Sequence, residues 1–68
     1  MPTTEPVIAD RLMLVSMLTV GDYAIELSET VMVRPGQRHW VEGSTFYVQS
    51  PDGRTRAVDG SAYPICRR

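Results

Sequence analysis

Five glycines divide this 68-residue chain into short runs of β-prone residues, and this punctuation limits what it can fold into. The strongest turn signal is Pro51-Asp52-Gly53, in which proline presets φ, aspartate can bond its own backbone and glycine accepts a positive φ. Frequent turns between short strands are typical of small antiparallel barrels and sandwiches. The sequence therefore predicts an all-β fold, a small antiparallel barrel or sandwich of five to seven short strands.

Residues 7–20 can be interpreted in two ways. A helix over residues 5–19, packed on an antiparallel sheet, would make the fold α+β. A strand is favoured because residues 23–28 alternate with period two and Gly21-Asp22 is a suitable hairpin turn. Pairing Val20 with Tyr23 across this turn would give one core-facing set: Leu12, Leu14, Leu18, Val20, Tyr23, Ile25 and Leu27.

The opposite face of that strand would expose Met13, Val15 and Met17. An exposed apolar surface usually marks a subunit contact. A chain this short buries a modest share of its surface, and Cys66 is the only cysteine, so an internal disulfide is impossible. We therefore expect a homodimer that uses these three residues.

Residues 38–58 hold the candidate binding face. With turns at Glu42-Gly43 and residues 50–53, the simplest register sets Trp40 opposite Thr45, and Gln49 opposite Arg54. Side chains alternate between faces along a strand. The core side would then carry His39, Val41, Phe46, Val48, Thr55 and Ala57. The outer side would carry Arg38, Trp40, Thr45, Tyr47, Gln49, Arg54, Arg56 and Val58.

Five residues of that outer side predict a partner-binding site: Arg38, Trp40, Tyr47, Arg54 and Arg56. These residue types dominate protein-interface hot spots. The leading hypothesis is a non-catalytic protein-binding module, such as a small inhibitor, adaptor or regulator. The same side chains also suit a nucleic-acid-binding barrel, but the formal net charge of -1 disfavours it. In a competing structural interpretation, Trp40 belongs to the core and this surface does not exist.

Charge is unevenly distributed. Residues 1–33 hold one arginine and five acidic residues, whereas residues 34–68 hold six arginines and three acidic residues. The simplest explanation is attraction between the two halves, within one chain or across a dimer. Glu42, Asp52 and Asp59 are expected in solvated turns.

No catalytic or metal chemistry is predicted. One histidine, His39, and one cysteine cannot complete a tetrahedral zinc site, and no nucleophile-elbow or phosphate-loop motif is present. We expect neither an enzyme nor a cofactor.

Residues 1–6 are expected to be frayed, residues 7–66 to form one domain and residues 67–68 to be solvated. The start of the chain lacks a basic region, and its apolar run is too short to span a bilayer. These features predict a cytoplasmic protein without a membrane partner. Its size suggests an accessory protein of a phage or mobile element.

Overall fold

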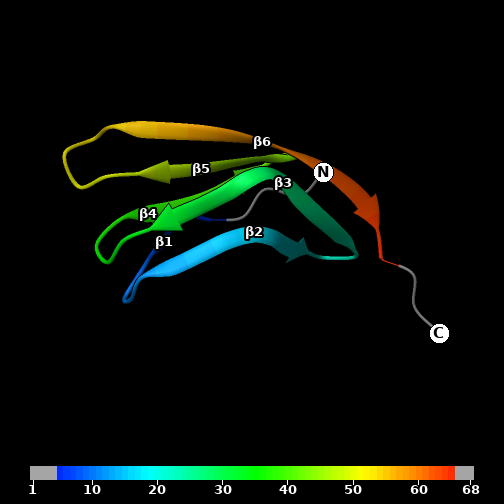
Figure 1. Cartoon of the computed structure of the whole chain (residues 1–68), viewed down its shortest axis with the longest axis horizontal. Helices are drawn as coiled ribbons and strands as arrows, with labels where there is room; N and C mark the ends of the chain where they lie inside the picture. Colours follow the sequence, from blue (N-terminus) through cyan, green and yellow to red (C-terminus); the bar gives the residue numbers. More distant parts are fainter. Residues whose placement is uncertain (1–4, 66–68) are drawn as a thin grey trace.

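The computed structural model describes residues 5–65, which form six strands and no helix. The strands are β1 (Val7–Ile8), β2 (Met13–Val20), β3 (Tyr23–Val33), β4 (Arg38–Glu42), β5 (Thr45–Gln49) and β6 (Thr55–Pro64). They make one antiparallel sheet in the order β1-β4-β5-β6-β3-β2, curled into a half-barrel (Figure 1). The all-β prediction is confirmed.

The alternative helix over residues 5–19 is wrong, since that segment forms β1 and most of β2. The described residues contain no helix that is long and apolar enough to cross a membrane. The expectations for residues 1–4, for Cys66 and for residues 67–68 lie outside the described range.

Strand β6 holds the two halves of the sheet together. Residues 55–59 pair with β5, and residues 60–64 pair with β3 (Figure 1). The change of partner occurs at Gly60, where a Cβ atom would lie 2.7 Å from the carbonyl oxygen of Ser44 and 2.8 Å from Cγ2 of Ile25. A residue without a side chain is what permits backbone and core to approach so closely.

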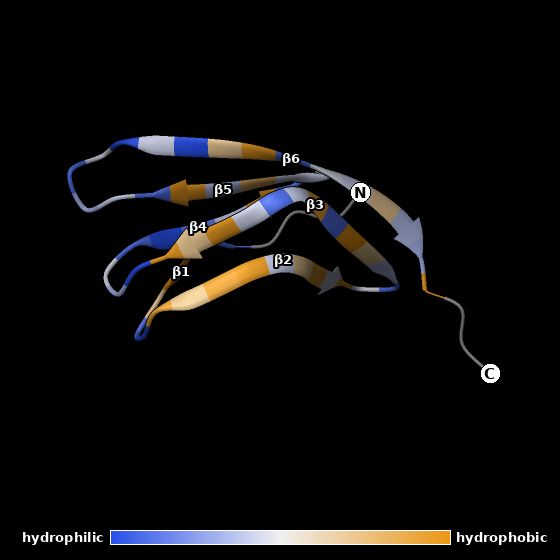
Figure 2. Ribbon diagram, in the orientation of Figure 1, coloured by the Kyte–Doolittle hydropathy of each residue, from blue (hydrophilic) through white to orange (hydrophobic). Residues whose placement is uncertain are grey.

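The core lies inside the curl. Its largest fully buried side chains are Phe46, Ile25, Val31 and Val33. The other buried members of the cluster are Ala9, Val20, Leu27, Val41, Val48 and Val58. Apolar and polar bands alternate along most of the strands, whereas β2 is apolar along nearly its whole length (Figure 2). This alternation is what buries one face of the sheet and leaves the other in water.

The β2–β3 hairpin begins in the expected register and then departs from it. Val20 pairs with Tyr23 and Leu18 with Ile25, as predicted. Beyond Met17 the pairing is irregular, and residues 27–30 of β3 lie opposite Ser16 alone. Such an irregularity changes which face the following residues occupy.

The faces of the first half of β2 are therefore the reverse of those expected. Met13 and Val15 pack against the core, although the sequence predicted them at a subunit contact. Leu12 and Leu14 were expected in the core and are exposed. Met17, on the other side of the irregularity, is exposed as expected.

Candidate functional site

The β4–β5 hairpin places Trp40 directly opposite Tyr47. Its turn is Gly43-Ser44 rather than the expected Glu42-Gly43, and Trp40 pairs with Tyr47 rather than Thr45. The pairing differs from the expected one by two residues. Because side chains alternate with period two, an even difference leaves every side chain on its expected face.

The two faces of this hairpin differ sharply. Phe46 is only 2% exposed, and its ring centroid lies 6.0 Å from that of His39 on the inner face. On the outer face Trp40 and Tyr47 are half-buried and stack, with ring centroids 5.4 Å apart and an interplanar angle of 10°. Trp40 is thus absent from the buried core cluster, and its position in the core is not observed.

A hydrogen bond to the last residue of β4 also stabilises the stack. Trp40 Nε1 donates a hydrogen bond to Glu42 Oε1 at 3.3 Å. An aromatic pair in this geometry contributes about 0.5–1.5 kcal/mol beyond the area that it buries. The indole is therefore held by two contacts while part of it faces solvent.

The aromatic row continues onto β6. Tyr47 pairs with Ala57, which is exposed and too small to cover the phenol ring. We call Trp40, Tyr47 and Ala57 the aromatic platform. The row on one side of it is Arg38, Gln49 and Thr55, and the row on the other side is Glu42, Thr45 and Asp59.

The platform thus lies between charges of opposite sign. Arg38 is exposed and makes no ion pair within residues 5–65. Glu42 and Asp59 are exposed on the other side. Both were expected in turns and are strand residues. Neither residue was predicted from the sequence as part of this face. The spacing of Glu42 from Trp40, two residues along one strand, could have placed these two side chains on the same face.

Arg56 does not belong to this face. The expected register between β5 and β6 is wrong by one residue, because Gln49 pairs with Thr55 instead of Arg54. An odd error exchanges the faces of the whole strand. Arg56 therefore lies beside Val48 on the inner side, where its guanidinium forms an ion pair with Glu29 of β3.

Arg54 lies in the turn before β6. Its backbone N–H donates to Asp52 Oδ1 at 3.1 Å, and its Nε is 3.3 Å from Asp52 Oδ2. Ser50 and Gly53 close the same turn through backbone hydrogen bonds. The charge of Arg54 is thus partly balanced locally, and Arg38 is the stronger candidate for contacting a partner.

An apolar slot opens between β4 and the last residues of β2. Its lining residues are Glu5, Val7, Leu18, Thr19, Val20, His39, Trp40, Val41 and Phe46. The slot marks the seam along which the half-barrel stays open. Burial at this seam lowers the pKa of His39 from its ordinary value of 6.5.

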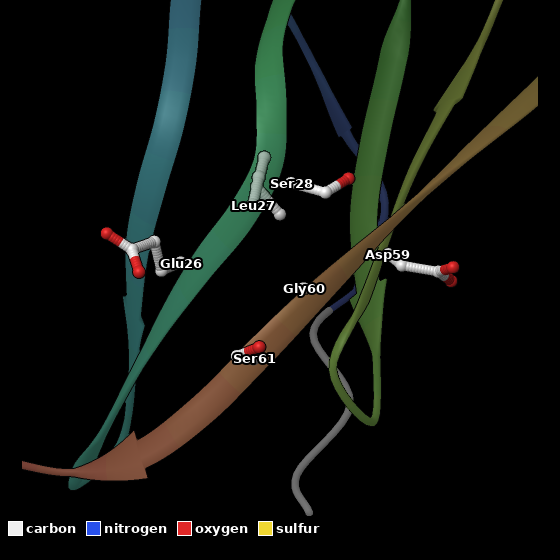
Figure 3. A pocket seen from close by; sticks show the side chains of 6 residues that line it. All are labelled: Glu26, Leu27, Ser28, Asp59, Gly60 and Ser61. Carbon is white, nitrogen blue, oxygen red and sulfur yellow. The ribbon is translucent and has the colours of Figure 1, made fainter.

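A second hollow lies where β3 and β6 diverge, next to their last pair, Leu27 with Gly60 (Figure 3). It is lined by Glu26, Leu27, Ser28, Asp59, Gly60 and Ser61. The carboxylates of Glu26 and Asp59 point away from each other (Figure 3). The part of the chain that the structure describes holds no cluster of three or more metal-ligating side chains. This hollow therefore offers no converging ligand set.

A scan against protein-family models, a search of curated proteins and a search of solved structures gave no match to this chain. The geometry of the aromatic platform is consequently the basis on which function is inferred.

Proposed function

We propose that this protein is a non-catalytic protein-binding module, a small inhibitor, adaptor or regulator, whose partner docks on the aromatic platform. The observation that carries the proposal is the outward stack of Trp40 on Tyr47. Large aromatic side chains that are already ordered lose little entropy on binding and bury much apolar area. A cytoplasmic location is part of the same proposal.

The charges beside the platform favour a protein over a nucleic acid. Single-strand binders combine aromatic side chains with a positive groove that follows the phosphates. Here Arg56 is neutralised on the inner face, and Glu42 and Asp59 lie next to the stack. Those carboxylates would repel phosphate, whereas a protein surface can present both signs of charge.

The two charged rows also indicate what the partner surface presents. A carboxylate would face Arg38, and a basic group would face Glu42 and Asp59. Between them, an apolar or aromatic side chain would cover Tyr47 over the small Ala57. This arrangement of an apolar centre with a polar rim is the usual anatomy of a specific interface.

The test uses three proteins: wild type, Trp40→Ala and Thr55→Ala. Each is immobilised, and proteins captured from a lysate by the wild type are identified, purified and titrated against all three. We expect Trp40→Ala to weaken binding by at least about 30-fold, the size of a hot-spot loss of about 2 kcal/mol. Thr55→Ala, on the neighbouring row of the same face, should change affinity by less than about threefold.

Cooperative urea unfolding of Trp40→Ala would show that the loss of affinity is not a loss of fold. Equal binding by wild type and folded Trp40→Ala would contradict the proposal. So would tight binding of single-stranded oligonucleotides with an affinity that falls steeply as salt rises, since this is the signature of phosphate contacts.

A further inference from the structure

The two edges of the sheet are protected to very different degrees. β1 is two residues long, follows Pro6 and precedes the charged pair Asp10-Arg11. Short length, proline and charge all prevent an edge from pairing with another chain. β2 is eight residues long and contains neither a charged residue nor a proline. Within residues 5–65 it pairs only with β3, so its other edge forms no strand pair; the last three residues of β2 border the apolar slot opposite β1 and β4.

Exposed apolar side chains follow this unprotected edge. Leu14 is 69% exposed and Met17 is 56% exposed. Met32, which pairs with Leu14 on the neighbouring strand and is 48% exposed, lies one strand in from this edge and is not part of the proposed contact. The hydroxyl of Tyr63 reaches across β3 to the sulfur of Met17 at 3.6 Å. An apolar band of this kind is typical of a contact surface.

The burial of β2 is symmetric about the peptide between Ser16 and Met17. Because the alternation inverts there, both of these residues are exposed, and more buried and exposed residues alternate in the same order in either direction from the centre; only the outermost pair differs in degree, since Met13 is half-buried and Val20 is buried. The pairs at equal distance from it are Ser16 with Met17, Val15 with Leu18, Leu14 with Thr19, and Met13 with Val20.

Antiparallel partners share a face of the sheet. A two-fold axis through the centre of β2 would therefore set every side chain opposite one that faces the same way. A strand with unbroken alternation could not achieve this in the same register, because each inward residue would oppose an outward one. The irregularity that reverses the first half of β2 is what makes the strand complementary to itself.

The same axis brings opposite charges together. Arg11 lies two residues before Met13, and Asp22 lies two residues after Val20, so they are equally far from the centre. Arg11 of one copy would consequently approach Asp22 of the other, twice in each dimer. Both residues are exposed, and the ion pair of Arg11 with its neighbour Asp10, at 3.5 Å, is too weak at this exposure to hold it.

We propose that two copies of this protein associate by antiparallel β2–β2 pairing about this axis, which joins two half-barrels into one continuous sheet. The partner is a second copy, because both the burial pattern and the flanking charges complement those of the chain itself. The contact is isologous, so every interaction occurs twice. It retains Met17 from the predicted contact and removes Met13 and Val15, which face the core.

Analytical ultracentrifugation over a wide concentration range tests the pairing. Met17→Lys places a lysine next to the axis in each copy, and we expect it to weaken dimerisation by at least about tenfold, through repulsion of like charges on a paired edge. Met32→Lys is the matched control, since it makes the same change at a similarly exposed methionine on β3. It should alter the dissociation constant by less than about threefold.

The charged residues on either side of β2, Arg11 and Asp22, test the register of the proposed β2–β2 pairing. Arg11→Asp and Asp22→Arg should each weaken the dimer by about two- to fivefold, the range expected for exposed ion pairs. A mixture of the two variants should recover wild-type affinity, because every substituted position then faces an opposite charge. Native mass spectrometry would show the mixed dimer in excess over either homodimer.

Several results would overturn the proposal. One is a wild-type protein that stays monomeric at every concentration. Another is a dimer whose dissociation constant is unchanged by Met17→Lys. If Trp40→Ala abolished that dimer instead, the aromatic platform would be the dimer contact. A mixture of the charge variants that fails to recover affinity would refute the register. Because the aromatic platform is tested by Trp40→Ala and this edge by Met17→Lys, the two proposals can fail separately.

Discussion

The β2–β3 and β4–β5 hairpins start from similar two-residue turns and end with different surfaces. In β4–β5 the alternation is unbroken, so one face is core and the other carries the aromatic platform. In β2–β3 the alternation inverts at Ser16, so an almost wholly apolar strand presents leucine and methionine to solvent. The difference teaches that the parity of a register, rather than its exact value, decides which side chains form a surface.

The largest expected effect tests this parity directly. Phe46→Ala should cost about 3–5 kcal/mol, comparable with the whole stability of a domain this small, so the variant should be mostly unfolded. Leu14→Ala should change stability by less than about 0.5 kcal/mol, although leucine is also large and apolar. Circular dichroism with urea titration measures both. A strongly destabilised Leu14→Ala would show that β2 has the faces first expected from its sequence.

The next effect concerns the residue that links the hairpins. Gly60→Ala would place a methyl group 2.8 Å from Cγ2 of Ile25 and 2.7 Å from the backbone carbonyl oxygen of Ser44, so the backbone would have to shift. We expect a loss of about 1–3 kcal/mol, seen as a lower urea midpoint. Ser61→Ala, at the next and exposed position, is the control and should lie within about 0.5 kcal/mol of wild type. Equal urea midpoints for the two variants would argue against a close approach of Gly60 to Ser44 and Ile25.

A smaller effect concerns the segment of β3 that β2 leaves unmatched. Glu29 lies in that segment, and its ion pair with Arg56 connects it to β6. Both side chains are more than half exposed, so a double-mutant cycle of Glu29→Gln and Arg56→Gln should give a coupling of about 0.2–1 kcal/mol. The coupling should decrease in high salt, because screening weakens exposed pairs. A coupling that does not respond to salt would mean that the contact is not electrostatic.

The smallest effect concerns the inner face of β4–β5. Burial lowers the pKa of His39, so the unfolded chain takes up a proton at a higher pH than the folded protein does. Titration of His39 should leave the free energy of unfolding unchanged above the ordinary pKa of 6.5. The free energy of unfolding should fall as the pH drops below that value towards the lower pKa of the folded state. Urea midpoints between about pH 5 and about pH 8 would show a shallow slope, and His39→Gln should remove it. A slope that persists in that variant would have to come from other groups.

The sequence was sufficient wherever turns and alternation agree. Gly21-Asp22 predicted the pairing of Val20 with Tyr23, and the alternation in β4 and β5 placed Trp40 and Tyr47 outside. It was insufficient at Ser16, because nothing in a run of apolar residues marks where alternation inverts. It was also insufficient at Arg56, since the length of a turn can change by one residue without any change in its glycine and proline signals.

Because β6 belongs to both halves of the sheet, neither half is complete until residues 55–64 are present. During synthesis the β2–β3 and β4–β5 hairpins leave the ribosome first, and isolated hairpins are marginally stable in water. We expect the domain to fold only after β6 has emerged, slowly and in one cooperative step, as chains with many long-range pairings do. In that interval the apolar strand β2 has no folded domain around it, so translation is the stage at which we expect aggregation between nascent chains to be most probable.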